Sequence, residues 1–157
     1  MKRIILEPKY LIPTDCPRSL KGVLRFIPML CAGKTLHPIA AVPVPASAGR
    51  SQSARYLVCS GNHRAAATFI CKVAITADVI ESDDDLSKVR EGAVSEYHSV
   101  DDLAAACLEA AESGGYLAGG WEEYLRMITD SGVVGYSELD TARLSENALR
   151  RGPRNAP

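Results

Sequence analysis

The sequence predicts an α+β (mixed α/β) protein, in which a small β-sheet is followed by C-terminal helices. Short apolar runs rich in Val, Ile and Ala predict strands in the first half of the chain. Apolar residues at helical spacing predict helices among these strands and through the second half. Hydrophobic residues make up 46% of the 157 residues, which is enough to bury a core. The pattern changes near residue 82, so we expect a first domain at 1–82 and a helical extension at 83–157 that packs on it.

The N-terminal segment is expected to contain a short strand at residues 3–6, followed by several prolines. Apolar spacing then predicts a helix over residues 19–32. Ser19 is its candidate N-cap, and Gly33 is suited to end it. Pro28 falls inside the pattern, so the helix is expected to be kinked or broken into two pieces.

Two further apolar runs, residues 38–44 and 55–59, are predicted to pair as a β-hairpin. Pro43 lacks a backbone donor, so it favours an edge position or an early end for the first of them. A helix is predicted over residues 63–72 and another strand over 73–80. This order of strand, turn, helix and strand predicts a βαβ-like unit.

The C-terminal part is predicted to be helical. The acidic residues 81–85 are interpreted as a solvated connector. A serine cap and acids in the first turn predict a helix over residues 99–112. Two more helices are expected, from Trp121 to about Asp130 and over 137–151. Trp121 is expected to pack the C-terminal helices against the sheet.

The net charge is −1, but the charges are unevenly distributed. Residues 1–77 contain eleven Lys or Arg and two acids, whereas residues 78–112 contain eleven acids and two bases. A basic N-terminal half suits an anionic ligand. The two regions could equally face each other or the solvent, so charge alone leaves both interpretations open.

Compartment and redox state are indicated by two patterns. No apolar run reaches the roughly 18 residues needed to span a bilayer, and the N-terminal apolar run is too short for a secretion signal. A soluble, cytoplasmic protein is therefore expected. The cysteines lack the spacing of zinc or redox motifs, so buried reduced thiols are expected and no metal site is predicted. They are Cys16, Cys31, Cys59, Cys71 and Cys107.

The segment Gly61-Asn62-His63-Arg64 lies where a predicted strand turns into a predicted helix. Glycine there allows unusual backbone angles and close approach of a ligand, while the unpaired N–H groups of a helix start favour an anion. His63 and Arg64 add donors, and Asn62 can orient an oxygen or cap the helix. The segment therefore predicts a phosphate-binding cup. The alternative is an ordinary glycine turn with a solvated Arg and a locally bonded His.

Residues 56–67 combine a strand, the Gly-x-His-Arg turn and an Ala-rich helix, and they resemble the core box of the ParB/sulfiredoxin-like fold superfamily. Residues 36–42 resemble the Pro-Ile-x-Val segment of that family, and residues 73–80 the strand that closes the unit. The similarity covers roughly residues 3–82, about half of the chain. It implies a small sheet that binds a nucleotide phosphate at the turn.

The branches of this superfamily carry different residues at several positions, and the residues of this chain can be compared with each branch. Sulfiredoxins carry a cysteine nucleophile between the Gly and the His, whereas this chain has Asn62, so sulfinic acid reduction is not expected. Cys59 is close in sequence, but strand alternation does not place it in the cup. The ParB partitioning proteins bind CTP and DNA and usually carry Glu before the basic pair. The acidic to neutral second half of this chain is a poor match to duplex DNA.

The free serine kinases, a third branch, carry an acidic residue in a Pro-x-Glu element before the first helix. A Pro-Thr-Asp segment ends at Asp15 here, so the resemblance implies that Asp15 is a catalytic carboxylate, although it is one methylene shorter and could be a turn residue. The implied cofactor is a nucleotide (ATP, ADP or CTP) with Mg²⁺. Lys34 and His37 flank the adjacent strand and could reach a second phosphate or be loop residues. Arg18 and Arg25 add positive charge near the first helix.

The resulting hypothesis is a nucleotide-binding ParB-like protein that hydrolyses a nucleotide or transfers its phosphate to a small hydroxyl substrate. The alternatives are a non-catalytic nucleotide-responsive regulator and a nucleic-acid-binding ParB-like module. A ParB-type nuclease would need metal-binding carboxylates, and residues 83–85 fit a solvated connector better. The expected partners are a nucleotide and a small-molecule substrate, whereas nucleic acid is less expected and a membrane is not expected.

Overall fold

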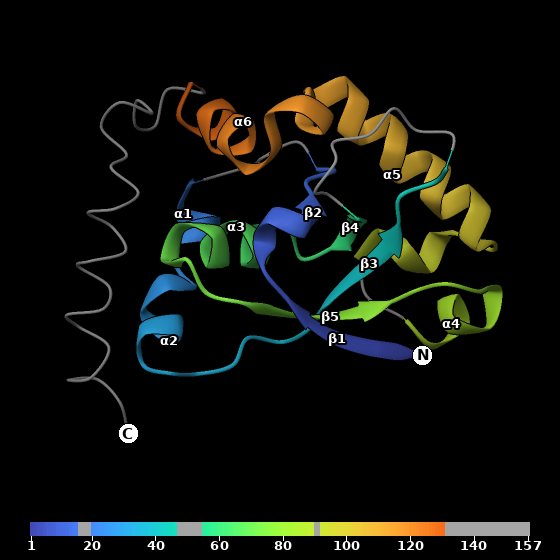
Figure 1. Cartoon of the computed structure of the whole chain (residues 1–157), viewed down its shortest axis with the longest axis horizontal. Helices are drawn as coiled ribbons and strands as arrows, with labels where there is room; N and C mark the ends of the chain where they lie inside the picture. Colours follow the sequence, from blue (N-terminus) through green and yellow to red (C-terminus); the bar gives the residue numbers. More distant parts are fainter. Residues whose placement is uncertain (16–19, 47–54, 90–91, 131–157) are drawn as a thin grey trace.

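The computed structural model describes residues 1–15, 20–46, 55–89 and 92–130. The described strands are β1 (Lys2–Leu6), β2 (Leu11–Ile12), β3 (Ile39–Pro43), β4 (Tyr56–Ser60) and β5 (Ile75–Val79). They form one mixed five-stranded sheet in the order β1-β5-β3-β4-β2, and helices pack against this sheet (Figure 1). The fold is therefore of the α+β class, as the sequence predicts.

Several predictions fall outside the described residues. They are the candidate cap Ser19, the charge of Arg18, the thiol of Cys16 and the helix at 137–151.

Strand β3 lies at the centre of the sheet, and its residues Ile39 to Val42 are all buried. It pairs antiparallel with β4, which confirms the predicted hairpin, and parallel with β5. Pro43 ends the strand without occupying a sheet edge. The ladder with β5 extends only to Ala41, so the missing N–H of Pro43 leaves no gap there.

The predicted βαβ-like unit is arranged differently from a parallel crossover. Helix α3 (Asn62–Cys71) does connect β4 to β5, as predicted. However, β3 lies between these two strands, antiparallel to one and parallel to the other, so β4 and β5 run in opposite directions. Sequence order shows which elements follow each other but not which strands become neighbours.

Strand β2 is not apparent in the sequence because it has only two residues. Leu11 and Ile12 are both buried and pair in parallel with Tyr56 and Leu57 of β4. Two residues show no alternation, so this strand is defined by its pairing rather than by a local pattern.

Three short helices lie together on one side of β3. The helix predicted at 19–32 is broken into α1 (Leu20–Leu24) and α2 (Ile27–Cys31), as Pro28 indicated. Pro28 lies in the first turn of α2, where its missing N–H would have no intrahelical partner. Helix α3 packs against both of them and against β3 through its alanine-rich face.

The C-terminal helices α5 (Val100–Gly114) and α6 (Tyr116–Asp130) complete the described fold. Helix α5 packs on β4 and β3, and α6 packs on β2 and α3 (Figure 1). Helix α6 begins five residues before the predicted Trp121, and Gly120 kinks it with a φ of 54° and a ψ of −143°. Trp121 is buried, as expected, and its Nε1 donates to the carbonyl of Pro8 at 3.0 Å.

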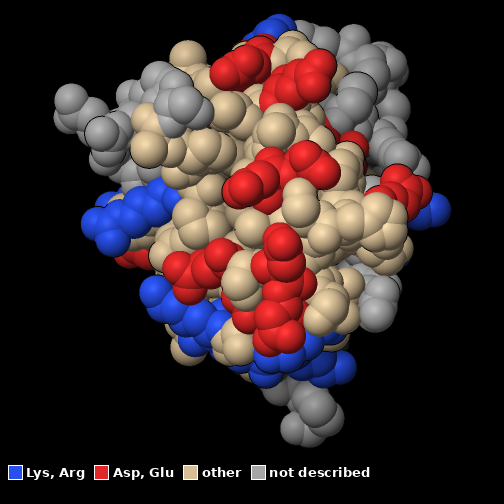
Figure 2. Space-filling view, turned by 90° about the vertical axis from the view of Figure 1, so that its right-hand side faces the viewer, with Lys and Arg blue, Asp and Glu red and all other residues tan. Residues whose placement is uncertain are grey.

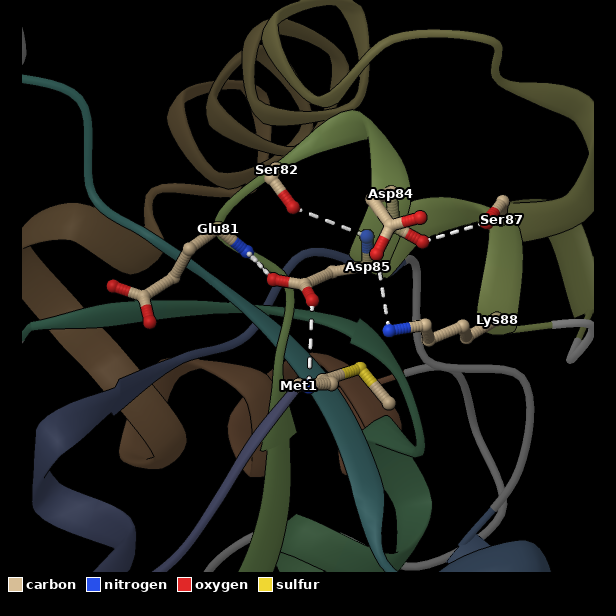
Figure 3. Close-up of polar contacts among 7 residues, drawn as sticks. All are labelled: Met1, Glu81, Ser82, Asp84, Asp85, Ser87 and Lys88. Atoms are coloured by element: carbon tan, nitrogen blue, oxygen red, sulfur yellow. Dashed lines mark hydrogen bonds and ion pairs between the residues drawn. The ribbon is translucent and has the colours of Figure 1, made fainter.

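The acidic residues predicted to form a connector instead open a helix, α4 (Asp83–Lys88). The hydroxyl of Ser82 accepts a hydrogen bond from the N–H of Asp85 at 3.1 Å, which caps the helix (Figure 3). Three acidic residues lie in the first turn, where their negative charges interact favourably with the positive end of the helix dipole. The acidic run is therefore a helix start, which a composition-based interpretation overlooks.

The carboxylate of Asp85 joins this helix start to the end of β5 (Figure 3). Its Oδ2 accepts the N–H of Glu81 at 3.0 Å, and its Oδ1 lies 3.6 Å from the amino group of Met1. The hydrogen bond from the Glu81 backbone is the main cause that lowers the pKa of Asp85, and the charge of the Met1 amino group adds to it.

We predict that Asp85→Asn destabilises the protein at neutral pH and that the difference shrinks on acidification. A lowered folded-state pKa contributes stability above the unfolded-state value of about 4, and this contribution is lost as the pH falls through the folded-state pKa. Urea unfolding between about pH 7 and about pH 3 measures this difference, with Glu109→Gln, at an exposed position of α5, as the control. A difference that stays constant across this range would contradict the prediction.

Candidate functional site

A cavity of about 410 Å³ lies at the carboxyl ends of β2 and β4. These strands are parallel, so the chain leaves both at the same edge of the sheet. Thr14 and Asp15 follow β2 there, and Ser60 and Gly61 lie where β4 ends. The carboxyl ends of strands are where open α/β sheets bind their ligands. This cavity is therefore the candidate functional site.

Elements on both sides of the predicted boundary at residue 82 form the cavity wall. Arg25 and Phe26, between α1 and α2, line it with the guanidinium carbon 4.6 Å from the ring centroid. Val94 of the 3-10 helix η2 (Gly92–Glu96) and Tyr97 add further lining. Helix α5 contributes four residues that share one helical face: Leu103, Ala106, Cys107 and Ala110. The volume falls within the roughly 300–1,000 Å³ that is typical of small-molecule sites.

Gly61 makes the turn from β4 into α3 in the left-handed conformation, with a φ of 102°. A Cβ at this position would lie 2.5 Å from Cγ2 of Ile39 and 2.8 Å from Nη2 of Arg64. Ile39 is fully buried in β3 and has no room to move. The position therefore requires glycine for two reasons, its backbone angles and the closeness of β3.

His63 and Arg64 line the cavity from the first turn of α3, as the sequence predicts. Both are half-buried. Arg64 Nη2 donates to the carbonyl of Pro38 at 3.3 Å, which holds the guanidinium beside the Gly61 turn. A guanidinium is a rigid fork of donors that matches pairs of phosphate oxygens. The arrangement is thus suited to an anion at the start of a ten-residue helix.

Asn62 is buried and joins α3 to the segment that follows β2. Its Oδ1 accepts the N–H of Thr14 at 3.1 Å, and its Nδ2 donates to the Thr14 hydroxyl at 3.4 Å. That hydroxyl in turn donates to the carbonyl of Val58 in β4. Asn62 therefore positions the Thr14 segment, a role that the sequence did not indicate.

Asp15 lines the same cavity, next to Thr14. Its carbonyl oxygen accepts the hydroxyl of Tyr116, which is buried in α6, at 3.0 Å. The Asp15 segment is thus anchored twice, by Asn62 of α3 and by Tyr116 of α6. Among the described lining residues Asp15 is the one carboxylate, and it faces the same space as Arg25 and Arg64.

Lys34 and His37 are not among the described residues that line this cavity. Both are exposed, and Lys34 lines a separate cavity with Gly33 and Thr76 near α2 and β5. Their residue types fit an anion, but the fold places neither side chain in the wall that holds Asp15 and the Gly61 turn. Their role as phosphate ligands stays a prediction from the sequence.

Two thiols, Cys59 of β4 and Cys107 of α5, also line the cavity. Cys107 and burial raise the pKa of Cys59 well above its usual value, and the neighbouring Cys59 lowers the pKa of Cys107. The sequence did not place Cys59 in the cup formed by residues 61–64, and in the structure Cys59 lines the cavity that adjoins this turn. The cavity extends beyond the Gly61 turn along the α5 side of β4, which Cys59 faces.

Acidic side chains gather on one face of the molecule (Figure 2). The view shows the side of the molecule formed by α4 and α5, where red side chains gather. Exposed acids of these helices are Asp83, Asp84, Asp101, Asp102, Glu109 and Glu112. Such a face repels nucleic acid phosphates. Among the described residues, no helix is long and apolar enough to cross a bilayer.

No protein-family model matches the sequence, and no curated protein shows significant sequence similarity to it.

Sequence reasoning missed the residues that shape the site from a distance. Tyr116 lies between the pairs Gly114-Gly115 and Gly119-Gly120, and a large aromatic with a hydroxyl between such glycines is itself a signal. Leu103 and Cys107 followed the pattern of an ordinary buried helix face, and nothing in that pattern indicates a cavity.

We predict that Gly61→Ala lowers the free energy of unfolding by about 3 kcal/mol, because left-handed strain and a clash with Ile39 add together. Gly33→Ala is the matched control. It has a φ of 75° but no atom within 4 Å of the added Cβ, so about 1 kcal/mol is expected from strain alone. Urea unfolding measures both variants, and equal losses would show that Ile39 does not restrict position 61.

We predict that Asn62→Ala costs about 1–3 kcal/mol of unfolding free energy, because it removes the partners of Thr14. A double-mutant cycle with Thr14→Ala is expected to give a coupling of about 0.5–1 kcal/mol. Thr68→Ala is the control, since its hydroxyl bonds within α3 to the carbonyl of Ala65. Coupling of Asn62 to Thr68 as strong as its coupling to Thr14 would contradict the proposed anchor.

Proposed function

We propose that this protein binds a nucleotide through its phosphates in the cavity, and that it hydrolyses the nucleotide or transfers a phosphate to a small hydroxyl substrate. The observation that carries the proposal is that Asp15, His63 and Arg64 line one cavity at a glycine turn. The resemblance of residues 56–67 to the core box of the ParB/sulfiredoxin-like superfamily supports the same function.

Phosphate binding is assigned to the start of α3. Backbone N–H groups of the first turn, the helix dipole and the guanidinium of Arg64 all favour negative charge at this point. Arg25 adds a second positive charge to the cavity lining. Phosphoryl transfer depends mainly on positioning and charge neutralisation, which these groups supply.

Asp15 is assigned the role of the base that accepts the proton of the attacking water or hydroxyl. Its anchors, Asn62 through Thr14 and Tyr116, fix the segment without using the carboxylate. Mg²⁺ would be held mainly by the nucleotide phosphates, with Asp15 as the carboxylate of the described cavity lining. When bound it neutralises charge on the phosphates.

The acceptor of the phosphate is expected to be small. Helix α5 and η2 form part of the cavity wall, and the outward side of α5 is acidic. Both features disfavour a nucleic acid substrate and leave water or a small hydroxyl compound. The alternative is a regulator that binds a nucleotide in the same cavity but does not convert it. In that case Asp15 lines the cavity without taking part in a reaction.

The proposal predicts distinct effects for Arg64→Lys and Asp15→Asn. Arg64→Lys keeps the charge but loses the fork, so nucleotide affinity should fall at least about tenfold. Asp15→Asn should keep affinity within about twofold and reduce turnover about 100-fold or more. Calorimetric titration with ATP, ADP, CTP and pyrophosphate in the presence of Mg²⁺ measures affinity, and phosphorus NMR identifies products.

Lys21→Ala, on the exposed side of α1, is the matched control for loss of a positive charge and should change affinity less than about twofold. Lys34→Ala tests whether Lys34 contacts a second phosphate, as the sequence analysis considered. The nucleotide affinity of this variant should also be unchanged. Failure of every nucleotide, pyrophosphate and phosphate to bind would refute the proposal. Binding without products in the unchanged protein would select the regulator.

A further inference from the structure

Two cysteines from different elements come together in the cavity wall. Cys59 is in β4, one residue before its end, and Cys107 is in the middle of α5. Helix α5 packs directly on β4, and both thiols line the same cavity. The proposed phosphoryl chemistry uses neither of them.

The two thiols differ in their readiness to lose a proton. The neighbouring Cys59 lowers the pKa of Cys107, whereas Cys107 and burial raise the pKa of Cys59. The Cys59 thiol itself donates to the carbonyl of Leu57 in its own strand at 3.8 Å. A thiolate is the form that attacks a disulfide, and a partner thiol beside it completes the exchange. The pair therefore has one nucleophilic and one resolving position.

We infer that Cys59 and Cys107 form a redox-active dithiol, which small disulfides entering the cavity oxidise to an intramolecular disulfide. The Cys107 thiolate attacks one sulfur of the reagent, forms a mixed disulfide and releases the first reagent thiol. Cys59 then loses its proton, attacks the Cys107 sulfur and releases the second reagent thiol. The reagent disulfide gains the two electrons and the two protons that the protein dithiol loses.

The expected product ties β4 to α5 beside the Gly61 turn. Cys59 is two residues from Gly61, and Cys107 shares its helical face with the lining residues Leu103 and Ala110. A covalent link at this point joins the strand and the helix along the cavity wall. Oxidation is therefore expected to restrict their movement relative to each other beside the Gly61 turn.

A second pair, Cys31 of α2 and Cys71 of α3, provides a matched comparison. These thiols lie on two helices that pack together, but neither thiol lines the cavity. Burial, the nearby Cys31 and its hydrogen bond raise the pKa of Cys71 to about 12, and burial raises the pKa of Cys31. Thiolate is scarce in this pair, so its exchange should be slow.

The experiment compares two triple variants treated with hydroxyethyl disulfide, which is small enough for the cavity. One variant, C16S/C31S/C71S, keeps only the cavity pair, and the other, C16S/C59S/C107S, keeps only the second pair. Intact-mass measurement should show the cavity pair losing two hydrogen atoms without a lasting adduct. The second pair should react at least about tenfold more slowly.

Two outcomes would overturn the inference: a stable reagent adduct on one cysteine with the other thiol still titratable, or equal rates for the two pairs. Peptide mapping of the unchanged protein after the same treatment gives the result even if a triple variant does not fold, and it must find Cys59 linked to Cys107. Because these measurements need no nucleotide, they remain decisive whether or not the proposed function is correct.

Discussion

The left-handed turn at Gly61 fixes how β4, α3 and β3 meet. With no Cβ, the backbone passes within contact distance of the Ile39 side chain and takes a φ that other residues resist. Helix α3 can then start immediately after β4, directly against the central strand. From this start Asn62 reaches Thr14, and Arg64 folds back to the carbonyl of Pro38. The other parts of the site take their positions from this turn.

The site is shared between parts of the chain that the sequence separates at residue 82. The segment holding Asp15 is anchored on one side by Asn62 and on the other by Tyr116, which lies beyond that boundary. Helix α5 forms a cavity wall and contributes Cys107. The C-terminal helices are therefore connected to the Gly61 turn through hydrogen bonds and packing.

Positive and negative charges lie on different surfaces of the structure, the cavity lining and the outer face. The basic first half and the acidic segment at 78–112 suggested two opposed regions in the sequence. In the structure, α5 turns an uncharged face to the cavity and its acids to the surface, while Arg25 and Arg64 line the interior space. An anion inside the cavity is therefore close to positive charge and separated from the acids by the width of a helix.

The sequence by itself determined the α+β class, most strands and helices, the break at Pro28 and the location of an anion-suited turn at Gly61. These follow from local periodicity, proline geometry and glycine freedom, which act over a few neighbouring residues. Only the tertiary structure decided that β2 exists, that β3 separates β4 from β5, and that α5 closes the cavity. It also excluded Lys34 from the wall and brought Cys59 into it. Such outcomes depend on contacts between residues distant in sequence, and local patterns carry no information about which distant segments pair.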